Sequence, residues 1–112
     1  MDLAKQTCIP CQGGSPPLKG GELLELLDLI DPSWSIVDEH HLTNTWTFPD
    51  FASALAFVNA IGAIAEEQGH HPDLHLSWGK VGVELWTHKI DGLVLADFIL
   101  ASKVDQLSTS DA

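Results

Sequence analysis

One long helical pattern constrains the fold of this chain more than any other feature. Residues 51–68 contain no proline, are rich in alanine, and carry apolar side chains at helical spacing. Asp50 stands where an N-cap carboxylate accepts backbone N–H groups, and Gly69 stands where a left-handed residue commonly ends a helix. At 1.5 Å per residue such a helix is about 27 Å long, so we expect it to be the central element of the core.

Alternating segments flank this helix on both sides. Residues 34–48 alternate between apolar side chains and threonines, which predicts two strands with a turn near Glu39–His40. Residues 74–88 predict a short strand through Trp78, a turn at Gly79–Lys80, and a second strand that His88 ends. Each pair is joined closely enough to be antiparallel.

Helical spacing returns at both ends of the chain. Residues 20–30 predict a helix of about three turns, near the average length, and residues 95–107 predict a third helix. The order α-β-β-α-β-β-α predicts an α+β fold, a two-layer sandwich in which a four-stranded antiparallel sheet has three helices on one face. We expect an irregular N-terminal arm over residues 1–18 and one domain over residues 19–108.

Charge narrows the range of partners. Five basic residues face sixteen acidic ones, a net charge of −11, which disfavours binding to nucleic acid or to an anionic membrane. No apolar run reaches the roughly 18 residues of a membrane span, and the first residues lack a signal-peptide core. We therefore expect a cytoplasmic protein.

Two cysteines and six histidines raise the question of a metal. Cys8 and Cys11 form one CxxC, but His70 and His75 follow about 60 residues later, whereas structural zinc needs four ligands in two close pairs. We therefore predict no metal and interpret the cysteines as a reduced pair rather than a redox motif, which would need a preceding strand. His40 and the next histidine are interpreted as solvated residues beside a turn.

A second group of histidines has more chemical promise. Glu66 lies in the last turn of the predicted long helix, four residues before His70, so its carboxylate could accept a ring N–H and fix the tautomer. Pro72 holds His71 in an extended conformation, and His88 could reach the same edge of the sheet. Histidine titrates near neutral pH, so these residues either form a proton-transfer site or are element-end histidines without a common purpose.

A longer pattern spans most of the chain. Glu66 and His70-His71-Pro72 form E-x-x-x-H-H-P, which is followed by His88 and Asp97, while W-T-F-x-D-F-x-x-A-L-A-F-V precedes it at residues 46–58. Over about residues 18–107 the chain resembles the pterin-4a-carbinolamine dehydratases. The resemblance implies the predicted fold and the loss of water from 4a-hydroxytetrahydropterin to give quinonoid dihydropterin, which recycles the pterin cofactor of aromatic amino-acid hydroxylases. It implies no metal and no cofactor.

The resemblance also implies roles for individual residues. The implied catalytic residues are His70, His71 and His88: His70 and His88 match the acid and base positions of the family, and His71 matches a histidine that contacts the pterin. Glu66 and Asp97 match acidic residues in or near that pocket.

The remaining predicted substrate contacts are Pro72, which belongs to the histidine motif, and Trp78. Leu74 stands where animal members often carry tryptophan, so we expect Trp78 or Trp86 to form that wall of the pocket. Val94 stands where the family usually has Ser or Thr, which removes a hydroxyl that would cap the third helix.

The competing class is an interaction protein. Animal relatives also act as partners of a transcription factor through the long helix, and here Ala56, Ala60 and Ala63 lie away from its most apolar stripe. Small side chains allow close helix packing, although they are also typical of an ordinary helix surface. We favour the enzyme, with self-association through residues 51–67 into a homodimer or homotetramer.

Overall fold

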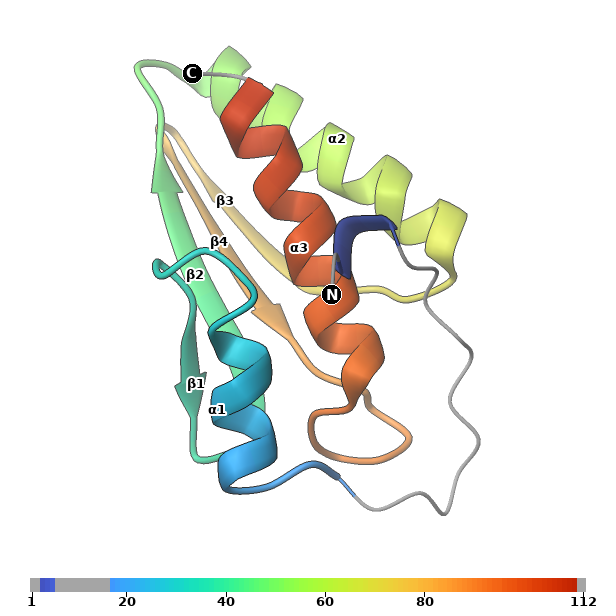
Figure 1. The fold of residues 1–112 in the computed structure, drawn as a ribbon. Coiled ribbons are helices and arrows are strands. Elements are labelled where there is room, and N and C mark those ends of the chain that lie inside the picture. Colours follow the sequence, from blue (N-terminus) through green and yellow to red (C-terminus); the bar gives the residue numbers. More distant parts are fainter. Residues whose placement is uncertain (1–2, 6–16, 111–112) are drawn as a thin grey trace.

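A four-stranded antiparallel sheet carries three helices on one side (Figure 1). The computed structural model describes residues 3–5 and 17–110 of the 112-residue chain. The elements after the N-terminal turn are α1 (Gly21–Leu27), β1 (Ser35–Val37), β2 (His41–Thr47), α2 (Phe51–Gln68), β3 (Asp73–Ser77), β4 (Lys80–Leu85) and α3 (Leu95–Ser110). The predicted α+β fold and element order are confirmed.

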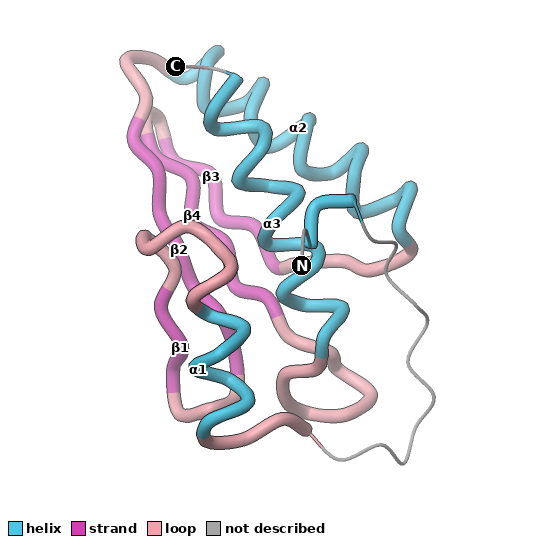
Figure 2. The backbone as a smooth tube through the Cα atoms, in the orientation of Figure 1, coloured by secondary structure: helices cyan, strands magenta, loops and turns pink. Residues whose placement is uncertain are grey.

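The sheet has the strand order β1-β2-β4-β3, so α2 carries the chain from β2 past β4 to the far edge (Figure 2). Along β4, Val81, Val83 and Leu85 are buried, while the residues between them are only partly buried. Asp73, the first residue of β3, pairs with Glu84, next to the end of β4. The segment that enters β3 and the segment that leaves β4 therefore lie at the same end of the sheet.

Aromatic contacts fix the long helix to the sheet. The ring of Phe57 on α2 is fully buried and lies 4.9 Å from the centroid of Trp46 and 5.2 Å from that of Phe48. Edge and tilted contacts of this kind add about 0.5–1.5 kcal/mol to the burial of the rings. Other fully buried side chains of the core come from all layers: Leu23, Leu42, Ile61, Val81, Leu85, Leu93, Phe98, Leu100 and Val104.

Both ends of α2 fall where the sequence predicts. The side chain of Asp50 accepts the Ser53 N–H at 2.8 Å, and this bond lowers the pKa of Asp50. Gly69 has φ of 65°, and its N–H bonds back to the last turn of the helix. The predicted bounds of 51–68 are confirmed because both caps are encoded locally.

Three element boundaries differ from the prediction. The first helix ends at Leu27, since Leu29 and Ile30 close tighter i→i+3 turns that bring Ile30 into the core. The turn between β3 and β4 lies at Trp78–Gly79, one residue earlier than predicted. The fourth strand ends at Leu85 rather than at His88, because Thr87 forms only an isolated bridge to Gly92.

Part of the N-terminal segment belongs to the core. Leu3–Lys5 form a short 3₁₀ turn, and the Leu3 side chain is buried within the main apolar cluster. The prediction of an irregular arm over residues 1–18 therefore misses one core contact. Cys8 and Cys11 lie outside the described residues. Over residues 3–5 and 17–110, none of the helices is long and apolar enough to span a membrane.

Candidate active site

The centre of the site is a histidine paired with a buried carboxylate. His70 directly follows the left-handed Gly69, and its Nε2 lies 2.6 Å from Oδ1 of Asp97 on α3. Asp97 is fully buried, and 14% of the His70 side chain is exposed. Because the carboxylate can only accept, Nε2 carries the hydrogen, and Nδ1 of a neutral His70 ring is the free base.

The structure corrects the predicted partner of His70. Glu66 does not bind His70; its Oε2 lies 2.5 Å from Nε2 of His71. The left-handed conformation at Gly69 turns the chain out of the helix, so the four-residue spacing of a helix no longer applies beyond it. Both members of the Glu66–His71 pair are exposed, at 78% and 60%.

Three donors converge on the Asp97 carboxylate. In addition to His70, the Thr87 hydroxyl and the Val94 N–H each donate to Oδ2 at 2.9 Å. Val94 directly precedes α3 and is its N-cap residue. The bond from its N–H to the Asp97 side chain is therefore one of the two bonds of a capping box. The predicted loss of a capping hydroxyl at Val94 is thus partly offset by the same carboxylate that holds His70.

His88 lies one residue from this group. It is exposed in the turn between Thr87 and Gly92, and its ring lies 4.4 Å from the centroid of Trp86. Thr87 bonds Asp97, so the backbone beside His88 is fixed to the carboxylate that orients His70. A Cβ atom at position 92 would lie only 2.6 Å from the Cβ of Pro17, which explains why a glycine closes this turn.

The other two predicted substrate contacts lie at opposite ends of β3. Pro72 is next to His71 at the start of the strand, whereas Trp78 is 68% exposed in the turn beyond its end. Five strand residues span about 17 Å, so Trp78 is not brought to the histidines. Trp86, the other tryptophan considered for the pocket wall, is the one that contacts His88.

The arrangement can exchange protons at one end of the sheet. A buried carboxylate fixes the tautomer of one imidazole, and a second imidazole stands in the adjacent exposed turn. Within the described part of the chain, no group of three or more His, Cys, Asp and Glu side chains could hold a metal ion. The fold and site together define a two-layer α+β sandwich with histidines and a buried carboxylate at one end of the sheet.

Comparison with known proteins gives this class a family. The family described as pterin 4 alpha carbinolamine dehydratase matches residues 16–107, and the chain belongs to it. A Rubrobacter xylanophilus protein that carries the family name is 52% identical over 106 residues, covering 95% of this chain and 98% of its own. A similarly named Alkaliphilus metalliredigens protein is 47% identical, covering 94% and 95%.

A solved structure extends the likeness to three dimensions. A transcriptional coactivator/pterin dehydratase from Brucella melitensis is 30% identical, with a TM-score of 0.75, over 81% of this chain and 97% of its own. A pterin dehydratase-like protein described as a RuBisCO assembly factor is 27% identical, with a TM-score of 0.59, over 68% and 89%. Related chains therefore carry names from more than one class of function.

Sequence reasoning missed two features of this region. No sequence pattern pointed to Thr87, because its hydroxyl donates to Asp97, which lies ten residues later across a turn. His40 and His41 were interpreted as solvated, but they are partly buried and contact each other and Trp86. Their strand parity could have shown that His41 and Trp86 share one face of the sheet, since Leu42 pairs with Leu85.

Proposed function

We propose that this protein removes water from a 4a-hydroxytetrahydropterin to give the quinonoid dihydropterin, by histidine acid–base catalysis in the cytoplasm. The reaction would return the pterin cofactor of aromatic amino-acid hydroxylases toward its working cycle. The observation that carries the proposal is the His70–Asp97 pair, 2.6 Å apart and almost fully buried, in a chain of this family.

The reaction needs one proton delivered and one removed. The C4a–O bond breaks with its electrons on oxygen, so a protonated imidazole must convert the departing hydroxyl to water. A ring N–H of the pterin must then give its proton to a base. Groups positioned for such transfers commonly contribute about 10²–10⁴ in rate.

His70 and His88 are proposed to share these two roles. With Nε2 of His70 bonded to Asp97, its Nδ1 is the nitrogen available to the pterin. His88 is exposed beside Trp86, whose indole offers an apolar surface next to the reacting groups. Because each imidazole can give and take a proton near neutral pH, the pair regenerates itself within one turnover.

His71, Glu66 and Pro72 are proposed to bind the substrate rather than to transform it. The Glu66–His71 pair is exposed, so it is free to hydrogen-bond polar edges of a pterin. Replacement of His71 by alanine should raise KM and leave kcat nearly unchanged, since such a contact is made equally in the ground and transition states.

The direct test is stopped-flow dehydration of freshly made carbinolamine by the purified protein. The protein should accelerate loss of the carbinolamine over buffer. His75→Ala, which changes a histidine on β3 outside the proposed site, is the control and should be as active as the wild type. A folded protein that gives no acceleration would contradict the proposal and favour the interaction function.

Self-association through the long helix, a property secondary to the proposed activity, has its own observation. Phe51 and Leu55 on α2 are exposed at 43% and 38%, and of the alanines predicted to form an outer face Ala56 and Ala63 are exposed and Ala60 is half-buried. We propose that this face joins copies of the chain. Replacing Ala60 with Glu should shift the mass in light scattering toward the monomer, because a charge would be buried at a close helix contact. A wild-type monomer at working concentration would remove the idea.

A further inference from the structure

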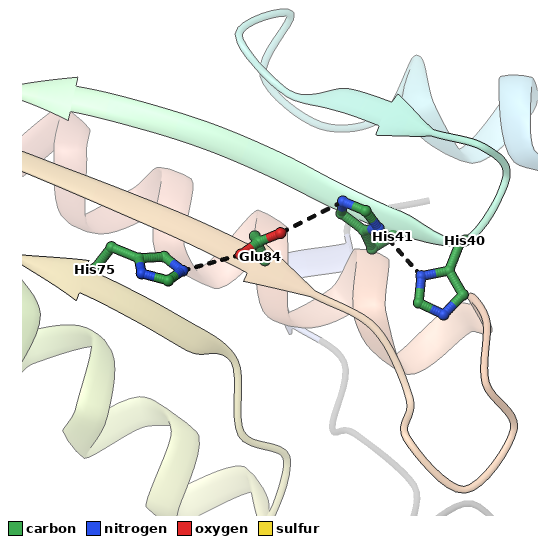
Figure 3. Close-up of polar contacts among 4 residues, drawn as sticks. All are labelled: His40, His41, His75 and Glu84. Atoms are coloured by element: carbon green, nitrogen blue, oxygen red, sulfur yellow. Dashed lines mark hydrogen bonds and ion pairs between the residues drawn. The ribbon is translucent and has the colours of Figure 1, made fainter.

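A second group of polar side chains lies on the opposite face of the sheet from the helices, outside the site described above. Nε2 of His75 on β3 lies 2.9 Å from Oε1 of Glu84 on β4, and Oε2 of Glu84 lies 3.6 Å from Nε2 of His41 on β2 (Figure 3). Nδ1 of His41 lies 3.1 Å from Nδ1 of His40. The row ends where Nε2 of His40 meets Oδ1 of Asp91 at 2.8 Å.

We propose that His40 is a positioning residue, which holds the turn carrying His88 through Asp91 and Trp86 while His41 fixes its tautomer. The catalytic part of this inference rests on the proposed function. It concerns neither proton transfer to the substrate nor binding of the substrate.

The contacts determine where the protons lie. The Asp91 carboxylate can only accept, so Nε2 of His40 must carry a hydrogen. In a neutral His40 ring Nδ1 is then an acceptor, and the facing Nδ1 of His41 must donate. A further proton can enter at Nε2 of His41, toward Glu84, without breaking any of these contacts.

A second added proton would have to enter between the two rings. Both Nδ1 atoms would then carry hydrogens and could not stay 3.1 Å apart. The groups that face the pair are Asp91 from the turn, Glu84 from β4 and Trp86, with His88 on the same indole. His40 therefore keeps its place only while the pair holds at most one extra proton.

The link to the site runs through two contacts. Asp91 has φ of 56°, a strained value for a residue with a side chain, and its N–H bonds the carbonyls of Thr87 and His88. The centroid of the Trp86 ring lies 5.4 Å from that of His40 and 4.4 Å from that of His88. Loss of His40 thus frees both the end of the turn and one neighbour of the indole against which His88 rests.

The expected effect is modest, because the Asp91 side chain is 86% exposed. An exposed pair contributes at most a small stabilisation, so His40→Ala should lower kcat by about threefold to fivefold. His40→Gln should restore most of the loss, since its amide can donate to Asp91 where Nε2 did. In the wild-type protein, double protonation of the His40–His41 pair should lower activity on the acid side of the pH profile. His40→Gln should lack this loss.

NMR tests the pair without any activity measurement. Long-range ¹⁵N–¹H spectra of the wild-type protein near neutral pH should show His40 with its hydrogen on Nε2. His40→Ala should shift the backbone amides of residues 87–92, and His75→Ala, the control at the far end of the row, should not. A His40 ring protonated on Nδ1 alone, or amide shifts and kcat of His40→Ala equal to those of His75→Ala, would overturn the inference. If the wild-type protein dehydrates no carbinolamine, the proposed function fails while the NMR result still decides the positioning.

Discussion

Two adjacent histidines are each paired with a carboxylate, and the two pairs differ sharply in burial. His70 and Asp97 are 2.6 Å apart with a fully buried carboxylate, whereas His71 and Glu66 are 2.5 Å apart with both side chains mostly exposed. Water competes for the exposed pair, and an exposed ion pair contributes only about 0–1 kcal/mol. The fully buried carboxylate of Asp97 has no such competitor, and its removal leaves its donors without an acceptor.

The difference between the pairs suits the adjacent histidines to the different tasks proposed for them. A ring that must present one fixed nitrogen to a reaction gains from a buried partner, because its tautomer and orientation are then set before the substrate arrives. A ring that only contacts the substrate can remain mobile and solvated. His70 and His71 meet these two descriptions, although the sequence shows them as a simple repeat.

The largest expected difference between the pairs comes from removing each carboxylate. Asp97→Ala should destabilise the fold by about 1–3 kcal/mol, because the Thr87 hydroxyl and the Val94 N–H lose their acceptor. It should also lower kcat by at least about tenfold, since it releases the tautomer of a proton-transfer group. Glu66→Ala is the matched control, with kcat within about threefold and a change mainly in KM.

Urea unfolding and stopped-flow dehydration of both variants give the comparison directly. Equal losses of stability and kcat in the two variants would mean that burial does not separate the pairs.

A smaller effect should follow from weakening the buried pair at its edge. Thr87→Val removes the hydroxyl that donates to Asp97 and keeps the shape of the side chain. One lost hydrogen bond predicts a destabilisation of about 1 kcal/mol. Thr45→Val, on the exposed face of β2, controls for the change from hydroxyl to methyl. Thermal unfolding that ranks the two variants equally would show that Thr87 does not support the Asp97 carboxylate.

The contrast between the pairs also shows what the sequence could predict. The bounds of α2, the order of the elements and the antiparallel sheet follow from local periodicity, from Asp50 and from Gly69. The site residues were picked out by motif, but their pairing was not. A helical count assigned Glu66 to His70, and the left-handed turn at Gly69 made that count invalid.

Contacts between distant segments explain the rest. Asp97 lies 27 residues after His70, and only the fold brings the start of α3 beside the end of α2. Asp91, which adopts a left-handed conformation without being glycine, contacts His40 from 51 residues away, and no local rule predicts that contact. The fourth strand ended earlier than its alternation predicted, because beyond Leu85 Thr87 forms only an isolated bridge to Gly92.

The smallest predicted effect comes from a partly buried carboxylate outside the two histidine pairs, that of Asp105. Burial raises the pKa of Asp105, although hydrogen bonds from the Asp31 N–H and the Trp34 indole oppose this. The folded state therefore binds this proton more tightly than the unfolded state, so the contribution of Asp105 to stability declines as the pH rises above 3.8 through the raised pKa. Asp105→Asn should gain stability relative to the wild type over that range, by no more than about 1 kcal/mol.

Urea unfolding of both proteins at pH 3.5 and pH 7 measures this change. If the stability of Asp105→Asn relative to the wild type decreased from pH 3.5 to pH 7, the hydrogen-bond donors would outweigh burial at Asp105.

The central claim is that His70, oriented by Asp97, and His88 exchange the protons of the reaction. The most direct measurement is the rate of carbinolamine dehydration by stopped flow for His70→Ala, His88→Ala and the double variant, with circular dichroism to confirm folding. Each single change should lower kcat by about tenfold or more, and the double change should lower it far more if the two rings serve as alternate donors. Full activity in a folded double variant would contradict the account.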